Sequence, residues 1–185
     1  PSAGLGHRLQ AVGRPAGYVI TRLLGAGGRG EVYRARDTRL GREVAIKTVG
    51  SQFADAISRR RLLKEARHAA TLSHANICTI YEIGESGDVP FIAMEYIDGQ
   101  PLGELCRGEG LPVAQALRYA SQIVDAVEHA HHRGIIHRDL KSSNVVVDAA
   151  GKATVLDFGL APRMPEGEGS PSAESFTTSH ALAGT

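Results

Sequence analysis

The sequence has no tryptophan, and aromatic residues make up only 5% of its 185 residues. It has two cysteines, Cys78 and Cys106, which lie far apart and fit neither a metal-binding spacing nor a disulfide framework. A reducing, cytoplasmic setting is therefore favoured. No apolar run approaches the length of a membrane span, so we expect no membrane segment in this chain, while a parent protein anchored elsewhere remains an open alternative.

Neither sign of charge is in excess. The chain has 21 Lys and Arg against 20 Asp and Glu, a formal net charge of +1. This balance argues against a nucleic-acid partner and against an acidic tail. The length is sufficient for one domain with a real core. The first residue is Pro1 and no signal-peptide pattern follows, so we interpret the N-terminus as a cut.

The most informative polar residues lie in the second half of the chain, in the segments 137–144 and 157–159. The residues between them read as an apolar strand, a turn at 148–151 and a second strand, which predicts a β-hairpin. Folding this hairpin places Asn144 opposite Asp157, with Asp139 on the loop that enters it. Two oxygen ligands beside a third acidic group suit Mg²⁺ and a phosphate ester.

A glycine-rich segment follows the first predicted strand, 18–24. Gly25, Gly27 and Gly30 allow a tight turn and a close approach to a phosphate. The same spacing occurs in Rossmann dinucleotide sites, where a helix follows. Here 31–35 reads as a second strand and 42–47 as a third, so the glycines lie inside a hairpin. A P-loop is excluded because no Gly-Lys-Ser/Thr follows.

Alternation along the third strand makes a further prediction. Val44 and Ile46 share one face, whereas Ala45 and Lys47 share the other. The small Ala45 leaves room for a flat adenine ring, and Val32 on the neighbouring strand covers it from the same side. Lys47 then reaches the phosphates.

Taken together, these motifs resemble the eukaryotic-type Ser/Thr protein kinase family, in a form similar to its bacterial members. The sequence matches H-R-D-L-K-x-x-N in full at 137–144, V-A-I-K at 44–47 and D-F-G at 157–159. The resemblance implies an α+β, two-lobed kinase-like fold. It implies an N-terminal extension at 1–17, a small antiparallel-sheet N-lobe with an αC helix at 18–97, and a partial helical C-lobe at 98–185. The chain stops before the Ala-Pro-Glu motif of that family.

The resemblance also implies catalytic roles. Asp139 would accept the proton of the substrate hydroxyl, and Lys141 would lie near the γ-phosphate. Asn144 and Asp157 would hold Mg²⁺. Glu65, in a helix predicted from Phe53 to Leu72, would pair with Lys47; the alternative is a surface glutamate partnered by Arg61.

ATP would be held by residues from both halves of the chain. Met94 would be the gatekeeper, although simple core filling is its alternative, and the backbone of Glu95 and Ile97 would contact the adenine edge. The full set of implied nucleotide contacts is Gly25, Gly27, Gly30, Val32, Ala45, Lys47, Glu65, Met94, Glu95, Ile97 and Val146.

Other features support this arrangement. A helix opened by Pro112 has one apolar stripe, and part of it is expected to lack cover. The stripe comprises Val113, Leu117, Ala120, Val124 and Val127. At the end of this helix lie three histidines, which suit a helix C-terminus, with a metal site as the alternative: His129, His131 and His132.

The resemblance also implies an internal stack of side chains, in which His137 has a structural role. Its members are Ala69, Ile80, His137 and Phe158.

Hydroxyls near the end of the chain lie where the family has its activation phosphate. Autophosphorylation at Thr177 or Thr178 would create a partner for Arg138, and ordinary solvated hydroxyls are the alternative. The predicted function is transfer of the ATP γ-phosphoryl group to Ser/Thr hydroxyls of a protein. The alternatives are an ATP-binding module without catalysis and, less favoured, a small-molecule phosphotransferase.

Overall fold

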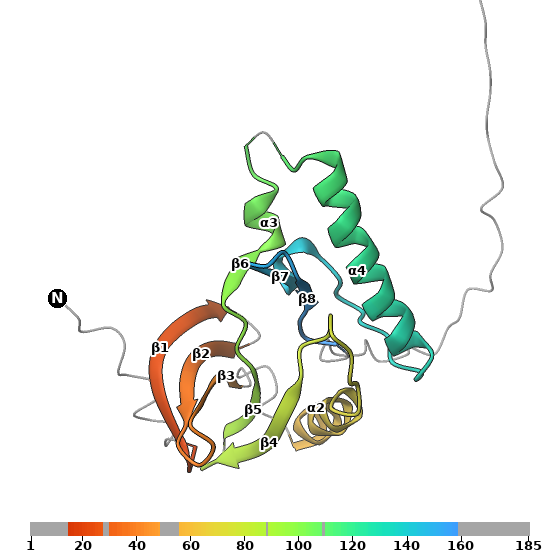
Figure 1. Ribbon diagram of the computed structural model, residues 1–185. Coiled ribbons are helices and arrows are strands. Elements are labelled where there is room, and N and C mark those ends of the chain that lie inside the picture. The colour runs from red at the N-terminus through yellow and green to blue at the C-terminus, as the bar shows by residue number, and fades with distance from the viewer. Residues whose placement is uncertain (1–14, 28–29, 49–55, 88, 109, 159–185) are drawn as a thin grey trace, which may run out of the picture.

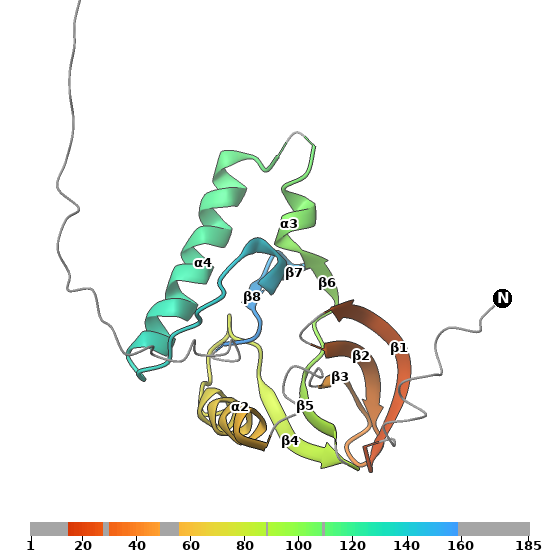
Figure 2. The same cartoon turned by 180° about the vertical axis from the view of Figure 1, so that it is seen from behind.

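In the computed structural model, the described residues are 15–27, 30–48, 56–87, 89–108 and 110–158. Figures 1 and 2 show two parts, a curved sheet with a helix beside it and a smaller group of strands with further helices. The chain belongs to the α+β class that the sequence predicted.

The first part is an antiparallel sheet of five strands in the order β1-β2-β3-β5-β4. The bounds along the chain are β1 Tyr18–Gly27, β2 Gly30–Asp37, β3 Arg42–Thr48, β4 Ile80–Ser86 and β5 Val89–Glu95. The three-strand prediction for the first 48 residues is therefore confirmed. The sequence also predicts strands near 77–83 and at 91–97, and the observed β4 and β5 are shifted from these positions because apolar runs do not mark where pairing begins.

The turn between β2 and β3 shows how local sequence fixes this sheet. The Asp37 carboxylate accepts hydrogen bonds from the Arg39 amide at 3.0 Å and the Leu40 amide at 3.3 Å. Gly41 has a φ of +69°, a conformation that a glycine adopts without strain. This turn sets the register in which Val32 lies opposite Lys47.

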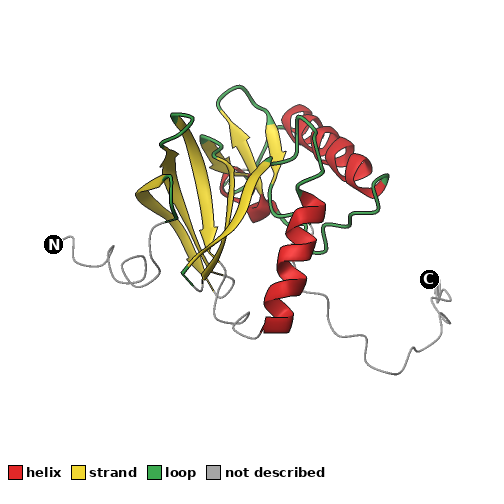
Figure 3. Cartoon of the chain, turned by 90° about the horizontal axis from the view of Figure 1, so that it is seen from below, coloured by secondary structure: helices red, strands yellow, loops and turns green. Residues whose placement is uncertain are grey.

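Helix α2, Ala56–Ala69, lies beside this sheet and is adjacent to β4 (Figure 3). The predicted helix, Phe53–Leu72, is too long at its C-terminal end, because 70–72 form turns, and 53–55 lie outside the described residues. Its buried side chains are Leu62, Ala66 and Ala69. This narrow apolar face is why the helix packs on one side only.

Among the described residues, the second part contains a three-stranded sheet in the order β6-β7-β8, with two α-helices and one 3₁₀ turn. The bounds are β6 Gly99–Pro101, α3 Leu102–Leu105, α4 Val113–His131, η2 Ser142–Asn144, β7 Val145–Asp148 and β8 Ala153–Val155. The predicted hairpin is confirmed. Asp148 closes its turn by accepting hydrogen bonds from the amides of Ala150 and Lys152, each at 2.9 Å.

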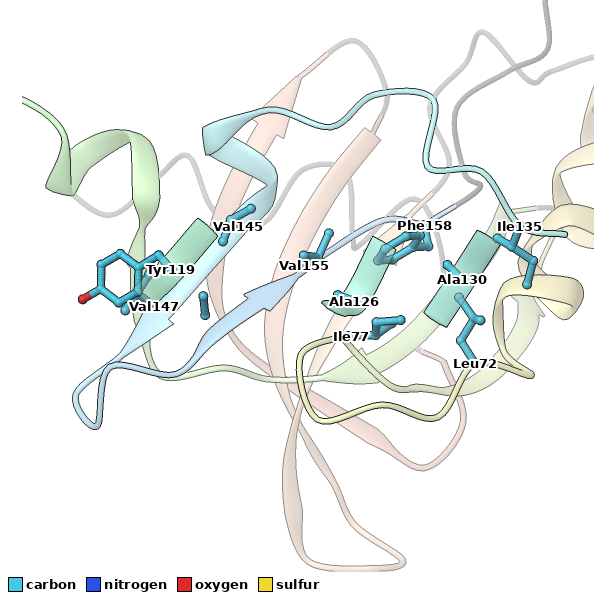
Figure 4. Close-up of a cluster of buried hydrophobic side chains, with 11 residues drawn as sticks. Leu72, Ile77, Tyr119, Ala126, Ala130, Ile135, Val145, Val147, Val155 and Phe158 are labelled. Carbon is cyan, nitrogen blue, oxygen red and sulfur yellow. The ribbon is translucent and has the colours of Figure 1, made fainter. Parts of the chain in front are cut away.

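A hydrophobic cluster joins this hairpin to α4 (Figure 4). Val145, Val147 and Val155 come from the hairpin, and Phe158 follows it. From α4 the buried residues are Tyr119, Ala126 and Ala130. The predicted stripe of α4 is a different face: Val113, Leu117 and Val124 are 75%, 65% and 62% exposed. The expectation that part of this stripe lacks cover is confirmed within the described residues, whereas Val127 of the same stripe packs against the cluster.

Candidate active site

Five polar residues predicted from three segments of the sequence meet at the open end of the β7–β8 hairpin. The Lys47 ammonium is 2.6 Å from the Asp157 carboxylate, although 110 residues separate them in sequence. The Asn144 side-chain amide donates to the Asp139 backbone carbonyl at 2.8 Å and to its carboxylate at 3.2 Å. Lys141 lies 3.0 Å from the same Asp139 carboxylate. The structure therefore brings the predicted catalytic and metal-binding residues into one region.

The hairpin register differs from the prediction by one residue. Val145 pairs with Val155, and the Leu156 amide donates to the Asn144 carbonyl at 2.8 Å. Leu156, not Asp157, is therefore opposite Asn144. The backbone turns at Asp157, which has a φ of +58°, and this turn directs its side chain to Lys47. A left-handed conformation in a residue with a side chain costs roughly 1–3 kcal/mol and occurs mainly at functional sites.

Arg138 is the other non-glycine residue with a left-handed backbone in the described ranges, with a φ of +64°. Its guanidinium is 3.1 Å from the Glu65 carboxylate. The predicted pairing of Glu65 with Lys47 is not among the ion pairs of the described residues, and neither is the alternative pairing with Arg61. The physical reason is that Asp157 already supplies the carboxylate that Lys47 needs, so Glu65 on α2 pairs with Arg138.

His137 is a structural residue, as predicted. It is 3% exposed, and its Nδ1 accepts a hydrogen bond from the Asp139 amide at 3.3 Å. Its Nε2 therefore donates to the Leu156 carbonyl at 2.8 Å. The ring also contacts Phe158, with centroids 4.7 Å apart. Both ring nitrogens are used, which fixes the loop carrying Asp139.

The predicted stack is divided between clusters. Phe158 packs with Leu72 in the cluster beneath the hairpin, whereas Ile80 packs against another cluster on the sheet. Ala69 is buried, at 5% exposed. Because alanine is short, it adds little surface to such a stack, and Leu72 lies in the cluster with Phe158 instead.

The residues predicted around an adenine gather on one face of the sheet. Ala45 and Met94 belong to one buried cluster, and Val32 and Ile97 pack against it. Val44 and Ile46 lie in a different cluster, as the alternation predicted. Val146 is half-buried on β7, between the buried Val145 and Val147, and so faces away from the α4 cluster.

The backbone of Glu95 is partly committed within the protein. Its amide donates to the Thr79 carbonyl at 2.8 Å, and the Cys78 thiol lies 3.6 Å from its carbonyl oxygen. Of the Glu95 backbone groups, only the carbonyl, which has a second lone pair, can therefore accept a hydrogen bond from a ligand.

Burial raises the pKa of the Cys78 thiol, and the nearby Glu95 carboxylate raises it further.

No described side chain covers the glycine-rich hairpin at Gly25 and Gly27. A Cβ added at Gly25 or Gly27 would meet no atom of the described chain within 4 Å. The packing of the sheet does not require glycine at these two positions. Gly30 has a φ of +122°, which does require it.

Sequence reasoning missed one group of positioning residues. The Asn76 side-chain amide donates to the Gln122 side chain at 2.9 Å and to the Ala153 carbonyl at 2.7 Å. The Asn76 carbonyl accepts from the Val155 amide at 2.8 Å. These bonds tie the loop after α2 to the hairpin and to α4. The only indication of this group in the sequence was the polar Gln122 next to the apolar Ile123 in the predicted helix.

The side-chain oxygens of Asn144 and Asp157 suit a hard cation that takes its remaining ligands from phosphates and water. No group of three or more His, Cys, Asp or Glu side chains within the described ranges is arranged to hold a metal. The Asn144 amide nitrogen is engaged by Asp139, so the orientation of its oxygen is fixed as an acceptor. One or two carboxylates and an amide oxygen suit Mg²⁺ that also binds phosphates and water. Gly159, Thr177 and Thr178 lie outside the described residues.

The chain resembles known proteins over most of its length. Residues 18–182 match the protein kinase domain family. The serine/threonine-protein kinase PrkC of Bacillus subtilis is 44% identical over 78% of this chain and 22% of its own length. The serine/threonine-protein kinase PknB of Mycobacterium tuberculosis is 36% identical over 91% of this chain and 27% of its own length. The chain thus spans about a quarter of these curated relatives.

A solved structure supports the fold. The crystal structure of the Mycobacterium tuberculosis PknI kinase domain aligns with a TM-score of 0.71 and 34% sequence identity. The alignment covers 80% of this chain and 61% of that one. No helix in the described part of the chain is both long enough and apolar enough to cross a bilayer.

Proposed function

The chain belongs to the protein kinase domain family, and from this premise we propose that it transfers the γ-phosphoryl group of ATP to serine or threonine hydroxyls of a protein. The observation that carries the proposal is the contact of Lys47 with Asp157 next to the Asp139–Asn144 pair. These residues come from the sheet, the loop before β7 and the end of the hairpin. A structural ion pair alone would not require the adjoining Asp139, Lys141 and Asn144 network.

In this proposal, Asp139 accepts the proton of the attacking hydroxyl. Lys141 and Asn144 both contact its Oδ2 atom, so they fix the direction of the carboxylate. Lys47 orients the phosphates through its ammonium, and because its side chain is only 15% exposed, this charge is weakly screened. Catalysis is then mostly positioning and charge stabilisation.

The nucleotide would lie between the glycine-rich hairpin and the face lined by Val32 and Ala45. Support comes from the clear outer surface at Gly25 and Gly27 and from the clustering of Met94 with Ala45. The Glu95 carbonyl and the Ile97 backbone would contact the adenine edge, and Val146 would close the opposite side. Glu65 would act indirectly, through α2, since it contacts Arg138.

Asn144 and Asp157 would hold Mg²⁺. When bound, the ion would neutralise charge on the phosphate oxygens.

We further propose residues 18–97 as the N-lobe, 98–185 as part of the C-lobe and 1–17 as an extension. A cytoplasmic location is proposed because ATP is required and both cysteines are free.

Autophosphorylation at Thr177 or Thr178 is part of the proposal. It is supported by Arg138, which directly precedes Asp139 and whose guanidinium is held by the Glu65 carboxylate. A phosphate would have to compete with the Glu65 carboxylate for this guanidinium, and its greater charge favours it. Mass spectrometry of the protein after incubation with ATP tests this proposal, with Thr177→Ala/Thr178→Ala as the control.

Transfer is tested with radiolabelled ATP and a basic protein substrate, using protein that contains this chain. Asp139→Ala and Lys47→Met should each lower turnover at least ~100-fold, the usual range for loss of a catalytic base or charge. Asp125→Ala, an exposed aspartate of α4, is the matched control and should keep full activity. Full turnover by Asp139→Ala would contradict the mechanism. ATP binding without any transfer would instead favour a nucleotide-binding module.

A further inference from the structure

The outer face of α2 has only basic side chains apart from Ile57. Five exposed residues lie within an arc of about 120° on the helix, opposite the buried Leu62 and Ala66. We call this set the basic stripe: Arg60, Arg61, Lys64, Arg67 and His68. Figure 1 shows α2 at the margin of the molecule, with β4 on one side.

Nothing acidic neutralises the basic stripe within the described part of the chain. The only acid of α2 is Glu65, which pairs with Arg138. None of the ion pairs between described residues includes Arg60, Arg61, Lys64 or Arg67. The first turn of the helix contains no acidic residue.

The basic stripe also works against the stability of its own helix. Like charges at i,i+3 and i,i+4 repel, and this spacing separates Arg60 from Lys64 and Lys64 from Arg67. Arg60 and Arg61 also lie in the N-terminal half of α2, nearer its positive dipole end. Neither folding nor packing explains why the charges are placed there, which points to a partner outside the chain.

We propose that the basic stripe binds an acidic segment of a partner protein. The stripe from Arg60 to His68 is about 12 Å long, which matches three to four residues of an extended peptide. In an extended peptide, alternate side chains repeat every ~6.7 Å, close to the ~6 Å between helix residues four apart. Arginine guanidinium groups bind carboxylates in a bidentate manner.

Two further observations favour a peptide over larger polyanions. The chain has a net charge of only +1, so it lacks the broad positive field that attracts nucleic acid or an anionic membrane over a distance. Ile57 is 77% exposed on the same face, one turn before Arg60 and Arg61, where it offers an apolar contact to a side chain of the peptide. The proposal extends beyond phosphoryl transfer and does not depend on it.

The experiment measures fluorescence anisotropy of a labelled decapeptide with glutamate at every second position, using the full chain. The matched peptide has glutamine in place of each glutamate. The variant Arg60→Gln/Lys64→Gln/Arg67→Gln removes three charges from the basic stripe. The control Arg22→Gln/Arg36→Gln/Arg107→Gln removes three exposed charges elsewhere. Melting temperature is recorded for both variants.

We expect the glutamate peptide to bind and the glutamine peptide not to bind. The stripe variant should lose at least tenfold in affinity and should melt no lower than the wild type, whereas the control should change by less than twofold. Equal losses in both variants would overturn the proposal, as would no binding of the glutamate peptide. Tighter binding of single-stranded RNA or of phosphatidylserine vesicles would overturn the choice of an acidic protein.

Discussion

The residues at the proposed site differ in how strongly their surroundings constrain them. Asp139 is held by the Asn144 amide and lies near Lys141, and its loop is held by both nitrogens of His137. Lys47 depends on one carboxylate, that of Asp157, at 2.6 Å. The loop that contains Asp139 is therefore well fixed. Lys47, in contrast, can leave Asp157 for another partner without breaking other hydrogen bonds of the site.

The two cysteines provide a test at the scale of single residues. Cys78 is buried, and burial raises the pKa of its thiol, so it has little reactive thiolate near neutral pH. Cys106 is exposed. We expect one thiol per chain to react quickly with a disulfide reagent at pH 8, and both to react in denaturant. Mass spectrometry should identify Cys106 as the fast site, and equal rates would contradict the burial of Cys78.

His129 gives a second test at this scale. Its ring lies 4.8 Å from the His74 ring, and Arg133 is 3.3 Å from its Nδ1. Burial lowers the pKa of His129 below 6.5, and the nearby charges of Arg133, His74 and His132 lower it further. The folded state therefore favours the neutral ring. This contribution to stability is complete above about pH 6.5 and is lost as the pH falls through the lowered pKa.

Urea denaturation at pH 7.5 and pH 5.5 measures this contribution. We expect the wild type to lose more stability between these values than His129→Gln, which cannot be protonated. His131→Gln, on the exposed side of the same helix end, is the control and should behave like the wild type. An equal pH dependence in all three proteins would show that His129 does not titrate as the contacts require.

At the scale of elements, α4 has two apolar faces. One packs against the hairpin through Tyr119, Ala126 and Ala130. The other is exposed and continues into a hollow of about 580 Å³ whose apolar lining includes Ile123, Val124, Val127 and Leu140. A helix apolar on more than one face is typical of burial on two sides. Nothing in the described residues shows what covers the second face.

We expect this second face to cause self-association of the isolated chain. Exposed, contiguous apolar surface of this kind favours association in water. Leu117→Gln/Val124→Gln should reduce the apparent mass in analytical ultracentrifugation at micromolar concentration. Arg107→Gln, an exposed change outside α4, should leave the mass distribution unaltered. An isolated chain that is monomeric at all concentrations would contradict the expectation.

At the scale of the whole molecule, two ion pairs between described residues connect the first part to the second. Lys47 on β3 contacts Asp157 after β8, and Glu65 on α2 contacts Arg138 before η2. The Asn76 hydrogen bonds form a third connection. These polar contacts act together with the apolar packing of Leu72 and Ile77 against the hairpin, and each polar contact can be removed singly.

A double-mutant cycle measures one connection. Arg138→Gln and Glu65→Gln should each lower the free energy of unfolding by about 1–2 kcal/mol, as expected for a charged hydrogen bond that remains partly exposed. The double variant should lose less than the sum of the two. Arg34→Gln, which breaks an exposed pair with Glu43 inside the sheet, should cost less. Strict additivity would contradict a direct contact.

The sequence predicted the first three strands and the hairpin well, because each depends on local alternation and turn residues, and motif spacing indicated which polar residues lie together at the end of the hairpin. Ala45 and Val44 are on opposite faces as their alternation required. The partners of charged groups were predicted less well. Glu65 was expected at Lys47 and lies at Arg138, since local spacing does not state which of two cations a helix will face.

By itself, the sequence determined the family, the order of most strands and the identity of Lys47, Asp139, Asn144 and Asp157 as one set, because these follow from patterns a few residues long. Only the tertiary structure decided which carboxylate meets Lys47, which face of α4 is buried and where Asn76 is bonded. Those contacts join residues that are tens of positions apart. Their geometry depends on how α2, α4 and the hairpin pack, which no short pattern encodes.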